Sequence, residues 1–211
     1  MTAAERAGVA VFAKAPVAGE VKTRLAARLG PREAACLHSL LVRRAVSTAV
    51  ASGLGPVEIW CAPDESHELF RRCAAEHRVA LRRQPGGDLG ARMAAAFAVA
   101  HARGDALLAI GSDCPALDAG LIREASAALA THDAVVIPAE DGGYVLLGLA
   151  RPSPGLFEGI AWGGGEVMAE TRERLRASGS RWIELETLWD VDRPEDYDRL
   201  VREGLLEEVR A

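Results

Sequence analysis

Short apolar runs alternate with longer amphipathic stretches along this sequence. Apolar runs of strand length lie at residues 8–13, 57–61, 79–83, 106–110, 134–138, 144–149 and 182–185. Stretches with the apolar spacing of a helix lie at residues 23–29, 32–51, 65–77, 89–102, 119–131, 166–178 and 194–202. Strands that alternate with helices predict an α/β fold, a three-layer α/β/α sandwich around a mostly parallel sheet.

The alternation fails at one place, between the strands expected at 134–138 and 144–149. No helix separates these two runs, which predicts an antiparallel element there. The sequence shows no internal repeat, low-complexity tract or linker. A chain of 211 residues with 49% apolar and 26% charged content fits one domain over residues 1–211.

Composition disfavours several classes of partner. The net charge of −5 argues against nucleic acid, and no segment approaches the roughly 18 consecutive apolar residues of a membrane span. The N-terminal residues carry no long apolar leader, so we expect a cytoplasmic protein without a membrane partner. The four cysteines lack metal-ligand spacing and are expected as reduced thiols. The sequence leaves the oligomeric state open, with a homodimer as one option.

Charge is unevenly distributed along the chain. Basic residues outnumber acidic residues eight to three in residues 1–44, whereas residues 184–211 hold ten acidic residues and four arginines. Such a chain could hold an anion at one place and a cation at another, or it could simply present two solvated faces of opposite sign. In α/β sheets, ligands bind outside the carboxyl ends of the strands. The loops that follow the first, fourth and fifth expected strands, at 14–22, 111–115 and 139–143, are therefore the expected places for a ligand site.

The first of these loops contains both lysines of a chain that otherwise uses arginine, Lys14 and Lys22. Chance in an arginine-rich composition is one explanation. The other is a diphosphate site, because Gly19 and a helix that opens at Lys22 bring backbone N–H groups next to clustered cations. We expect Lys22 and Arg24 to face solvent, and their replacement by alanine to weaken nucleotide binding by about 1.5–3 kcal/mol without loss of the fold.

In the second loop, Asp113 follows a buried apolar strand. A lone carboxylate at such a sheet edge is a common ligand for Mg²⁺ or Mn²⁺ bound to a nucleotide, and a turn-stabilising aspartate is the alternative. Asp118 is the expected cap of the following helix. Cys114 is disfavoured as a nucleophile, because no histidine stands at a recognisable spacing from it. As a metal ligand, Asp113 should tolerate alanine with little loss of stability.

The third loop holds Glu140 and Asp141, either in a plain hairpin turn or at the same sheet edge as Asp113. Near the C-terminus, Asp190 and Asp192 stand outside the last helix and could supply a second metal carboxylate. Pro194, Glu195 and Asp196 suit the first turn of that helix and are expected to be structural. Residues 162–165, Trp-Gly-Gly-Gly, suggest a mobile loop before a helix.

Several motifs together resemble a known family. They are Lys14-x-Pro16, Gly19-x-x-Lys22-Thr23-Arg24-Leu25, Asp88-Leu89-Gly90-x-Arg92-Met93, Gly111-Ser112-Asp113-Cys114-Pro115, Asp141-Gly142-Gly143-Tyr144 and Asp190-x-Asp192-x-Pro194-Glu195-Asp196. In order and over nearly the whole chain, they resemble the bacterial arsenosugar-biosynthesis-type glycosyltransferases, within the GT-A nucleotide-diphospho-sugar transferase superfamily. The Lys22–Leu25 segment is also similar to 2-phospho-L-lactate guanylyltransferases, and the last motif to molybdenum-cofactor nucleotidyltransferases.

The sequence departs from that family at three points. Arg193 replaces a threonine that would cap the last helix, which suggests a looser helix start. Gly164 and Gly165 replace a side chain that could contact an acceptor. The Asp-x-Asp metal motif of GT-A enzymes is reduced to Asp113, so metal dependence is an inference.

The resemblance implies a GT-A-like, Rossmann-related fold and a transferase that uses a nucleoside-diphosphate sugar and Mg²⁺ or Mn²⁺ to modify a small-molecule acceptor. The alternative is a guanylyltransferase-like nucleotidyltransferase that acts on a phosphorylated small molecule and releases pyrophosphate. A non-catalytic nucleotide-binding protein is a third class. The residues expected to act in catalysis are Asp113, Asp141 and Lys22. The expected nucleotide and phosphate ligands are Lys14, Pro16, Gly19, Lys22, Thr23, Arg24, Asp88, Gly90 and Arg92. The acceptor or sugar side is expected at Asp141, Gly142, Gly143, Tyr144 and Trp162, and the metal ligands at Asp113 and Asp192.

Overall fold

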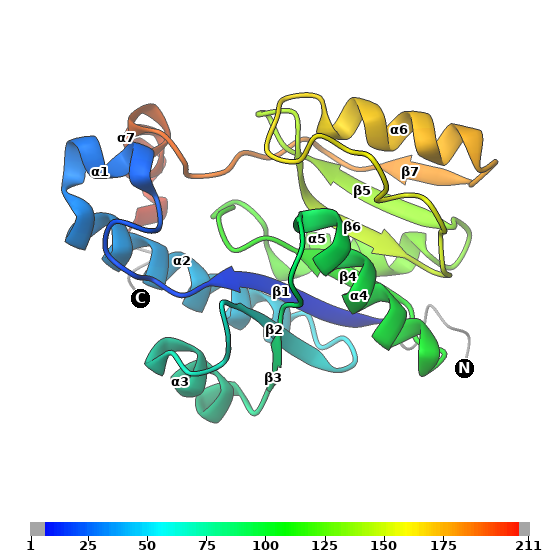
Figure 1. Ribbon diagram of the computed structural model, residues 1–211, viewed down its shortest axis with the longest axis horizontal. Coiled ribbons are helices and arrows are strands. Elements are labelled where there is room, and N and C mark those ends of the chain that lie inside the picture. The colour runs from blue at the N-terminus through cyan, green and yellow to red at the C-terminus, as the bar shows by residue number, and fades with distance from the viewer. Residues whose placement is uncertain (1–6, 207–211) are drawn as a thin grey trace.

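Seven strands form one sheet in the order β3-β2-β1-β4-β6-β5-β7 (Figure 1). The strands are β1 (Gly8–Lys14), β2 (Val57–Ala62), β3 (Ala80–Arg83), β4 (Leu107–Ile110), β5 (Ala134–Pro138), β6 (Tyr144–Leu149) and β7 (Trp182–Glu184). Within this sheet, β6 runs antiparallel to β4 and β5, and all other pairs are parallel. The expected α/β class, with a mostly parallel sheet and an antiparallel element, is confirmed. The computed structural model describes residues 7–206. Residues 1–6, the first of the basic segment, and residues 207–211, the last of the acidic segment, lie outside it.

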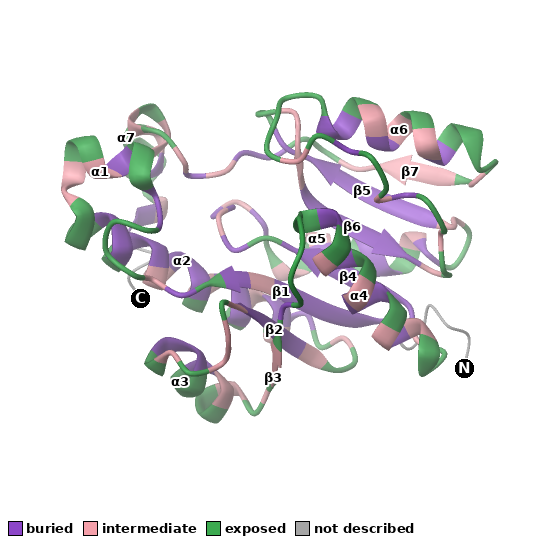
Figure 2. Cartoon of the chain, viewed as in Figure 1, coloured by how far each residue is buried: buried purple, intermediate pink, exposed green. Residues whose placement is uncertain are grey.

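Helices cover both faces of the sheet (Figures 1 and 2). They are α1 (Thr23–Leu29), α2 (Pro31–Ala51), α3 (Glu68–His77), α4 (Leu89–Ala102), α5 (Ala119–Ala128), α6 (Val167–Ala177) and α7 (Pro194–Arg202). The apolar side chains of α2, α3 and α5 form one core, and those of α4 and α6 form the core on the opposite face. A third, smaller cluster joins α1, α2 and α7. No helix in residues 7–206 has the length and apolar content to cross a bilayer.

Most element boundaries lie within a few residues of those expected from the sequence. The largest shift at a helix start is in α3, which begins at Glu68 because the His67 side chain caps it and accepts a hydrogen bond from the Leu69 N–H. At the other end of a helix, α5 stops at Ala128 instead of residue 131. The expected cap of α5 is confirmed, since Asp118 accepts from the Leu121 N–H at 2.8 Å.

The start of α7 has the carboxylate half of a capping arrangement. Asp196 accepts hydrogen bonds from the backbone N–H groups of Asp192 at 3.0 Å and Arg193 at 2.7 Å. Its negative charge also suits the first turn of the helix. Arg193 itself makes no side-chain cap hydrogen bond, in line with the sequence, and the structural role expected for Asp196 is confirmed.

Glu58 of β2 is a buried carboxylate on the sheet. Arg82 and Arg103 donate hydrogen bonds to its Oε1 at 3.1 and 2.9 Å. Burial alone would raise the pKa of Glu58, but the two guanidinium groups hold it below its usual range. A carboxylate whose pKa is lowered by folding stabilises the fold above its unfolded pKa, and this contribution is lost as the pH falls through the folded pKa.

We therefore expect Glu58→Gln to lower the free energy of unfolding at pH 7 by about 1.5–3 kcal/mol, the usual contribution of hydrogen bonds to a charged group. The difference from the unmodified chain should shrink below about pH 4, where glutamate is protonated in the unfolded chain. Urea denaturation at several pH values measures it. Exposed Glu68, which pairs with Arg72 one helical turn away, provides the control Glu68→Gln with a change below about 0.5 kcal/mol. An equal difference at pH 3 and pH 7 would contradict the ionic role of Glu58.

Candidate functional site

The carboxyl ends of β1, β4 and β5 lie at one edge of the sheet, because these strands are parallel. The loops that follow them carry the charged side chains predicted from the sequence. The segment between β7 and α7 then crosses the same edge. It pairs with the end of β5 through an Ala139–Leu188 bridge, and its Val191 N–H donates to the Asp113 carbonyl oxygen at 2.9 Å. The topology thus brings the C-terminal aspartates next to the first loop. Arg24 at the start of α1 and Asp192, which are 168 residues apart in the chain, form an ion pair there.

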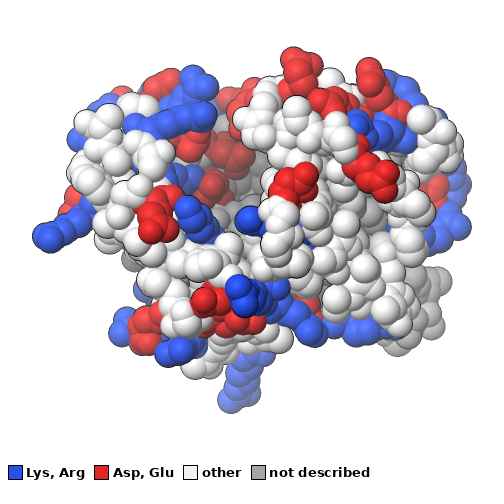
Figure 3. Space-filling model, viewed as in Figure 1, with Lys and Arg blue, Asp and Glu red and all other residues white. Residues whose placement is uncertain are grey.

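A cavity of about 380 Å³ opens at this edge. Figure 3 shows the corresponding hollow, between α1 and α7 on one side and the loop before α6 on the other, with acidic side chains inside it. It is lined by Arg24, Glu140, Asp141, Gly163, Gly164, Gly165, Trp189, Asp190, Asp192, Arg193 and Asp196. We call this cavity the acidic cleft.

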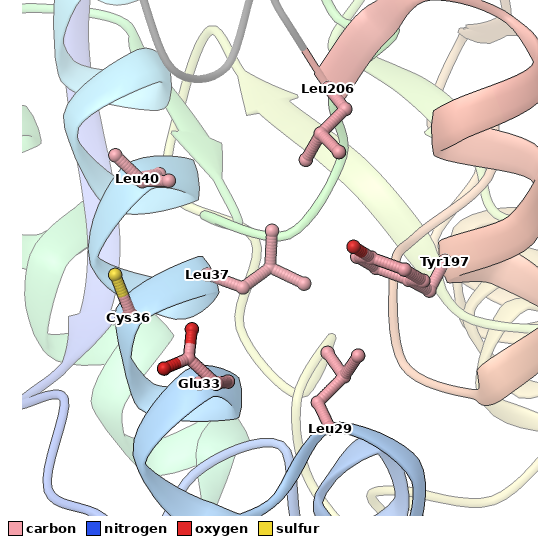
Figure 4. Close-up of a pocket in the computed structure, with 7 residues that line it drawn as sticks. All are labelled: Leu29, Glu33, Cys36, Leu37, Leu40, Tyr197 and Leu206. Carbon is pink, nitrogen blue, oxygen red and sulfur yellow. The ribbon is translucent and has the colours of Figure 1, made fainter.

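A second cavity, of about 230 Å³, has a different character. Figure 4 shows its lining by Leu29, Glu33, Cys36, Leu37, Leu40, Tyr197 and Leu206, between α1, α2 and α7. Its walls are mostly apolar side chains with no convergent group of charges. The acidic cleft combines a cavity with converging ionisable groups, the usual character of an active site, and is the candidate functional site.

Lys22 and Asp113 form an ion pair beside the cleft. The Lys22 ammonium lies 2.8 Å from Asp113 Oδ2, and the exposed fractions of the two side chains are 4% and 38%. Lys22 precedes α1 in the left-handed conformation, with φ of 47° and ψ of 41°. This turn directs its side chain inward. The expectation that Lys22 faces solvent is wrong, whereas Arg24 is exposed as expected.

Asp113 is consequently held in its ionised form. Burial would raise its pKa, but the Lys22 charge, together with His38, holds the pKa of the Asp113 carboxyl well below its usual range. The expectation from the sequence that alanine at position 113 costs little stability did not include this buried cationic partner. Removing this carboxylate would leave the buried Lys22 ammonium without its partner.

His38 is a site residue that the sequence interpretation missed. Its Nε2 lies 2.9 Å from the Lys14 carbonyl oxygen, and its Nδ1 lies 3.5 Å from Asp113 Oδ1. Nδ1 is buried and has no hydrogen-bond partner among the described residues. His38 lies in the apolar stripe of α2, with Ala34 and Leu41, and a histidine on such a stripe could have signalled a buried polar contact.

Asp190 is the aspartate most affected by its neighbours. Burial raises its pKa to about 7, and the charges of Asp113 and Asp141 act in the same direction. Its side chain has no hydrogen bond or ion pair within residues 7–206. Asp192 differs, because Arg24 donates to its Oδ2 at 2.5 Å. Of the two C-terminal aspartates considered from the sequence, Asp190 is the one left without a cationic partner.

The other predicted phosphate ligands lie around the first loop and α4. Lys14 is exposed, and its ammonium donates to the Glu20 carbonyl oxygen at 2.8 Å. Asp88 caps α4 by accepting from the Ala91 N–H at 2.8 Å. Arg92 donates from NH1 to Gln84 Oε1 at 3.4 Å and from Nε to the Gly87 carbonyl oxygen at 3.2 Å. In this structure Asp88 and Arg92 therefore hold the loop between β3 and α4. Pro16, Gly19 and Thr23 belong to the first loop and the start of α1, and Gly19 has a φ of +86°.

Glu140 and Asp141 have separate roles in the turn between β5 and β6. Arg199 of α7 donates to both oxygens of Glu140 at 3.0 and 2.9 Å, and its guanidinium lies over the Trp189 ring at 4.4 Å. Glu140 thus attaches α7 to the sheet. Asp141 Oδ1 accepts from the Gly143 N–H at 2.9 Å, as expected of a turn residue, and Asp141 also lines the acidic cleft.

The glycine loop before α6 packs closely on that turn. Gly142 has a φ of +90°, and a Cβ atom there would lie 1.9 Å from the Gly165 carbonyl oxygen. The Gly142 carbonyl oxygen accepts from the Met168 N–H at 2.8 Å. These contacts fix the loop that was expected to be mobile, and its glycines line the cleft with backbone alone.

Trp162 and Tyr144 lie below this loop, on the face covered by α4. Their rings meet edge to face at 6.5 Å, and the Tyr144 hydroxyl contacts Met93 Sδ at 3.6 Å. Gly90 allows the close approach of Trp162, because a Cβ atom at Gly90 would lie 2.6 Å from Trp162 Nε1. Burial raises the pKa of Tyr144. The sequence motifs at Gly90 and Tyr144 are thus joined through one aromatic contact.

Cys114 is buried next to Asp113, and burial raises the pKa of its thiol to about 12. A thiol with this pKa is almost entirely protonated at neutral pH and is a poor nucleophile. This agrees with the low rank that the sequence gave to a cysteine nucleophile. All four cysteines are free.

The carboxylates of the cleft suit a divalent cation in part. Oxygen ligands are the type that Mg²⁺ and Mn²⁺ prefer, and Asp141, Asp190 and Asp192 bring carboxylate oxygens to the cleft. Within residues 7–206, no group of three or more histidine, cysteine or acidic side chains is arranged to hold a metal ion. The donor set therefore fits a cation that takes one or two carboxylates from the chain and its remaining ligands from phosphate oxygens and water.

A mostly parallel sheet with charged loops at its carboxyl edge defines the class of α/β proteins whose ligand sites lie at that edge. The family comparison assigns the chain itself: residues 45–164, more than half of the sequence, match the family described as "Uncharacterized protein conserved in bacteria (DUF2064)". The chain belongs to this family. No curated protein matches the sequence.

Several solved structures with the same fold are described as transferases. The chain is 29% identical to a candidate nucleotide-diphospho-sugar transferase from Desulfovibrio desulfuricans G20, with a TM-score of 0.87 over 100% of this chain and 98% of that one. A nucleotidyl transferase from Methanothermobacter thermautotrophicus has a TM-score of 0.67 at 17% identity, over 96% and 99% of the chains. A manganese complex of a Mycobacterium tuberculosis H37Rv protein has a TM-score of 0.51 at 18% identity, over 93% and 97%. The last two likenesses concern the fold alone.

Proposed function

We propose that this protein is a metal-dependent transferase that takes a nucleoside-diphosphate sugar as donor and modifies a hydroxyl group of a small acceptor, as the arsenosugar-biosynthesis-type glycosyltransferases are expected to do. The observation that carries the proposal is the meeting of two kinds of charge at one cavity. Arg24 of α1 and carboxylates from the loops after β5 and β7 line the cavity, and the Lys22–Asp113 ion pair lies beside it. The similarity to the Desulfovibrio protein supports the donor class.

The first loop would bind the donor diphosphate. Lys14, Lys22 and Arg24 would contact its oxygens and stabilise the negative charge that develops on the leaving phosphates. The start of α1 adds backbone N–H groups on the same side. Asp141 would orient the acceptor hydroxyl and accept its proton, since its second oxygen is free of the turn hydrogen bond.

Asp113 would hold Mg²⁺ or Mn²⁺ together with a C-terminal aspartate. Sequence spacing proposed Asp192, but its carboxylate is paired with Arg24, whereas unpaired Asp190 interacts electrostatically with Asp113. The ion pair that engages Asp192 makes Asp190, which also lines the cleft, the favoured second ligand, with Asp192 as the alternative. When bound, such a cation supplies Lewis-acid neutralisation of the diphosphate charge.

A nucleotidyltransferase that releases pyrophosphate is the second candidate. The same cations would stabilise departing pyrophosphate, and the Methanothermobacter nucleotidyl transferase has this fold. Five carboxylates against two arginines line the cleft, which suits a neutral acceptor better than the phosphorylated acceptor that this candidate implies. The cleft therefore favours the glycosyltransferase.

We further propose that residues 1–211 act as a single domain in the cytoplasm, where its four free cysteines would stay reduced.

Product analysis separates the two reactions. The protein is incubated with Mn²⁺, a panel of polyol and sugar acceptors, and either nucleoside-diphosphate sugars or nucleoside triphosphates. We expect nucleoside diphosphate from the first set and no pyrophosphate from the second. Pyrophosphate release with a phosphorylated acceptor would establish the nucleotidyltransferase instead. Nucleotide binding without turnover in either set would contradict both.

A further inference from the structure

The Lys22–Asp113 ion pair occupies the place that the proposed cation needs. Lys22 Nζ lies 2.8 Å from Asp113 Oδ2, and Lys22 is nearly inaccessible, with 4% of its side chain exposed. A lysine that waited for a phosphate would project into the cleft. In this structure its backbone turn directs it onto the carboxylate.

One carboxylate oxygen cannot serve the ammonium and a divalent cation at the same time. A Mg²⁺ or Mn²⁺ ligand lies about 2.0–2.2 Å from the metal, so the two positive charges would approach within a few ångströms with no anion between them. The other oxygen, Oδ1, faces the buried His38 ring at 3.5 Å. Access of a cation to Asp113 therefore requires Lys22 to leave.

A diphosphate would give Lys22 an alternative partner of the same sign as Asp113. Lys22 stands directly before α1, at the end of the first loop, which is the loop proposed to bind that diphosphate. A cation that arrives alone must break the ion pair without compensation, whereas a cation that arrives with a diphosphate supplies the charge that Lys22 loses.

We propose, resting on the function proposed above, that the Lys22–Asp113 pair is a latch that closes the cation site of the free protein and opens when the cation binds together with a diphosphate. The chain would then bind its donor as a metal complex, and it would bind the bare cation weakly. An ion pair that is closed for about nine-tenths of the time or more weakens the apparent affinity for the bare cation about tenfold or more.

The test uses two probes, Mn²⁺ alone and the preformed Mn²⁺–pyrophosphate complex, each titrated into the full chain. Free Mn²⁺ is followed by electron paramagnetic resonance, and the complex by calorimetry. We expect Lys22→Met to tighten the binding of Mn²⁺ alone about tenfold and to weaken the binding of Mn²⁺–pyrophosphate. The opposite directions of these two changes are the signature of the latch.

The chain provides a matched control in its other lysine. Lys14→Met removes the same charge from the same loop, but the Lys14 ammonium is exposed and donates to a carbonyl oxygen, with no contact to Asp113. It should leave the affinity for Mn²⁺ alone within about twofold. Equal tightening in both variants would indicate a general charge effect and overturn the latch.

A measurement on the unmodified chain does not depend on how the variants fold. With only two lysines present, pulse acetylation read by mass spectrometry reports each one separately. Lys22 should react slowly in the free protein and faster, relative to Lys14, when Mn²⁺ alone is saturating. An unchanged Lys22 rate at saturating Mn²⁺ would overturn the latch while leaving the proposed function intact. A chain that binds neither Mn²⁺ nor its pyrophosphate complex would contradict the proposed function as well.

Discussion

Replacement of Asp113 by asparagine is expected to abolish Mn²⁺-supported nucleotide binding and to lower the melting temperature as well. The first effect follows from the proposed metal ligation. Loss of residues that only support a metal ligand changes affinity by about 10–100-fold, and loss of the ligand itself should exceed that. Calorimetric titration of a nucleotide with and without Mn²⁺ measures it.

The effect on stability follows from Lys22. With Asp113 neutral, the ammonium stays buried without a counter-charge, a change that typically costs about 3 kcal/mol or more. For a chain of this size we expect the melting temperature to fall by about 6–12 °C. Combining Asp113→Asn with Lys22→Met removes both charges and should restore part of the lost stability, a coupling that a double-mutant cycle isolates.

Asp118→Asn provides the control in the same loop. Asp118 caps α5 by accepting from the Leu121 N–H, and asparagine caps helices about as well as aspartate. It should change neither nucleotide binding nor the melting temperature by much. A nucleotide titration in Asp113→Asn that still responds to Mn²⁺ as the unmodified chain does would exclude Asp113 as a ligand.

Much of the site's location was predictable because it depends on strand order in the chain and on strand direction. Asp113 follows a buried strand and Lys22 follows another, and parallel strands bring their carboxyl ends to one edge. That rule needs no knowledge of tertiary contacts. It placed the first loop, the Asp113 loop and the Asp141 turn at the same edge, where the structure has them.

The charge pairs within the site were not predictable in the same way. Several carboxylates in the sequence could pair with Lys22 and Arg24. Which of them do so depends on how the segment after β7 crosses the sheet edge. It also depends on a single left-handed residue before α1 that turns Lys22 inward. Hydrophobic periodicity carries no information on either feature, so a lysine in a polar loop was expected to be solvated.

His38 illustrates a different limit. Its position on the apolar stripe of α2 was visible in the sequence, but the stripe alone does not say which polar group lies opposite. The ring faces the Lys14 carbonyl oxygen, 24 residues earlier, and the Asp113 carboxylate, and both come near it only once α2 packs on β1. A buried histidine in a helical stripe therefore predicts a partner without identifying it.

Gly142→Ala is expected to have the largest structural effect on the acceptor side of the cleft. An added Cβ atom would lie 1.9 Å from the Gly165 carbonyl oxygen, a backbone atom that cannot rotate away, and Gly142 has a φ of +90°. The backbone strain costs about 1–3 kcal/mol, and the overlap adds about as much. The turn at Asp141 and the glycine loop must therefore separate.

This separation would reach function through two connections. Asp141 precedes Gly142 directly, and the Met168 N–H at the start of α6 donates to the Gly142 carbonyl oxygen. Displacing the turn moves the proposed acceptor carboxylate away from the first loop. This should lower turnover more than nucleotide affinity, because Lys22 and Arg24 belong to a different segment.

Gly164→Ala is the matched control. A Cβ atom at Gly164 would meet only the Ala161 carbonyl oxygen, at 3.4 Å, so the stability and the nucleotide affinity should stay close to those of the unmodified chain. Equal losses of nucleotide affinity and turnover in Gly142→Ala would indicate that the two halves of the site are not separable, and would contradict the assignment of Asp141 to the acceptor.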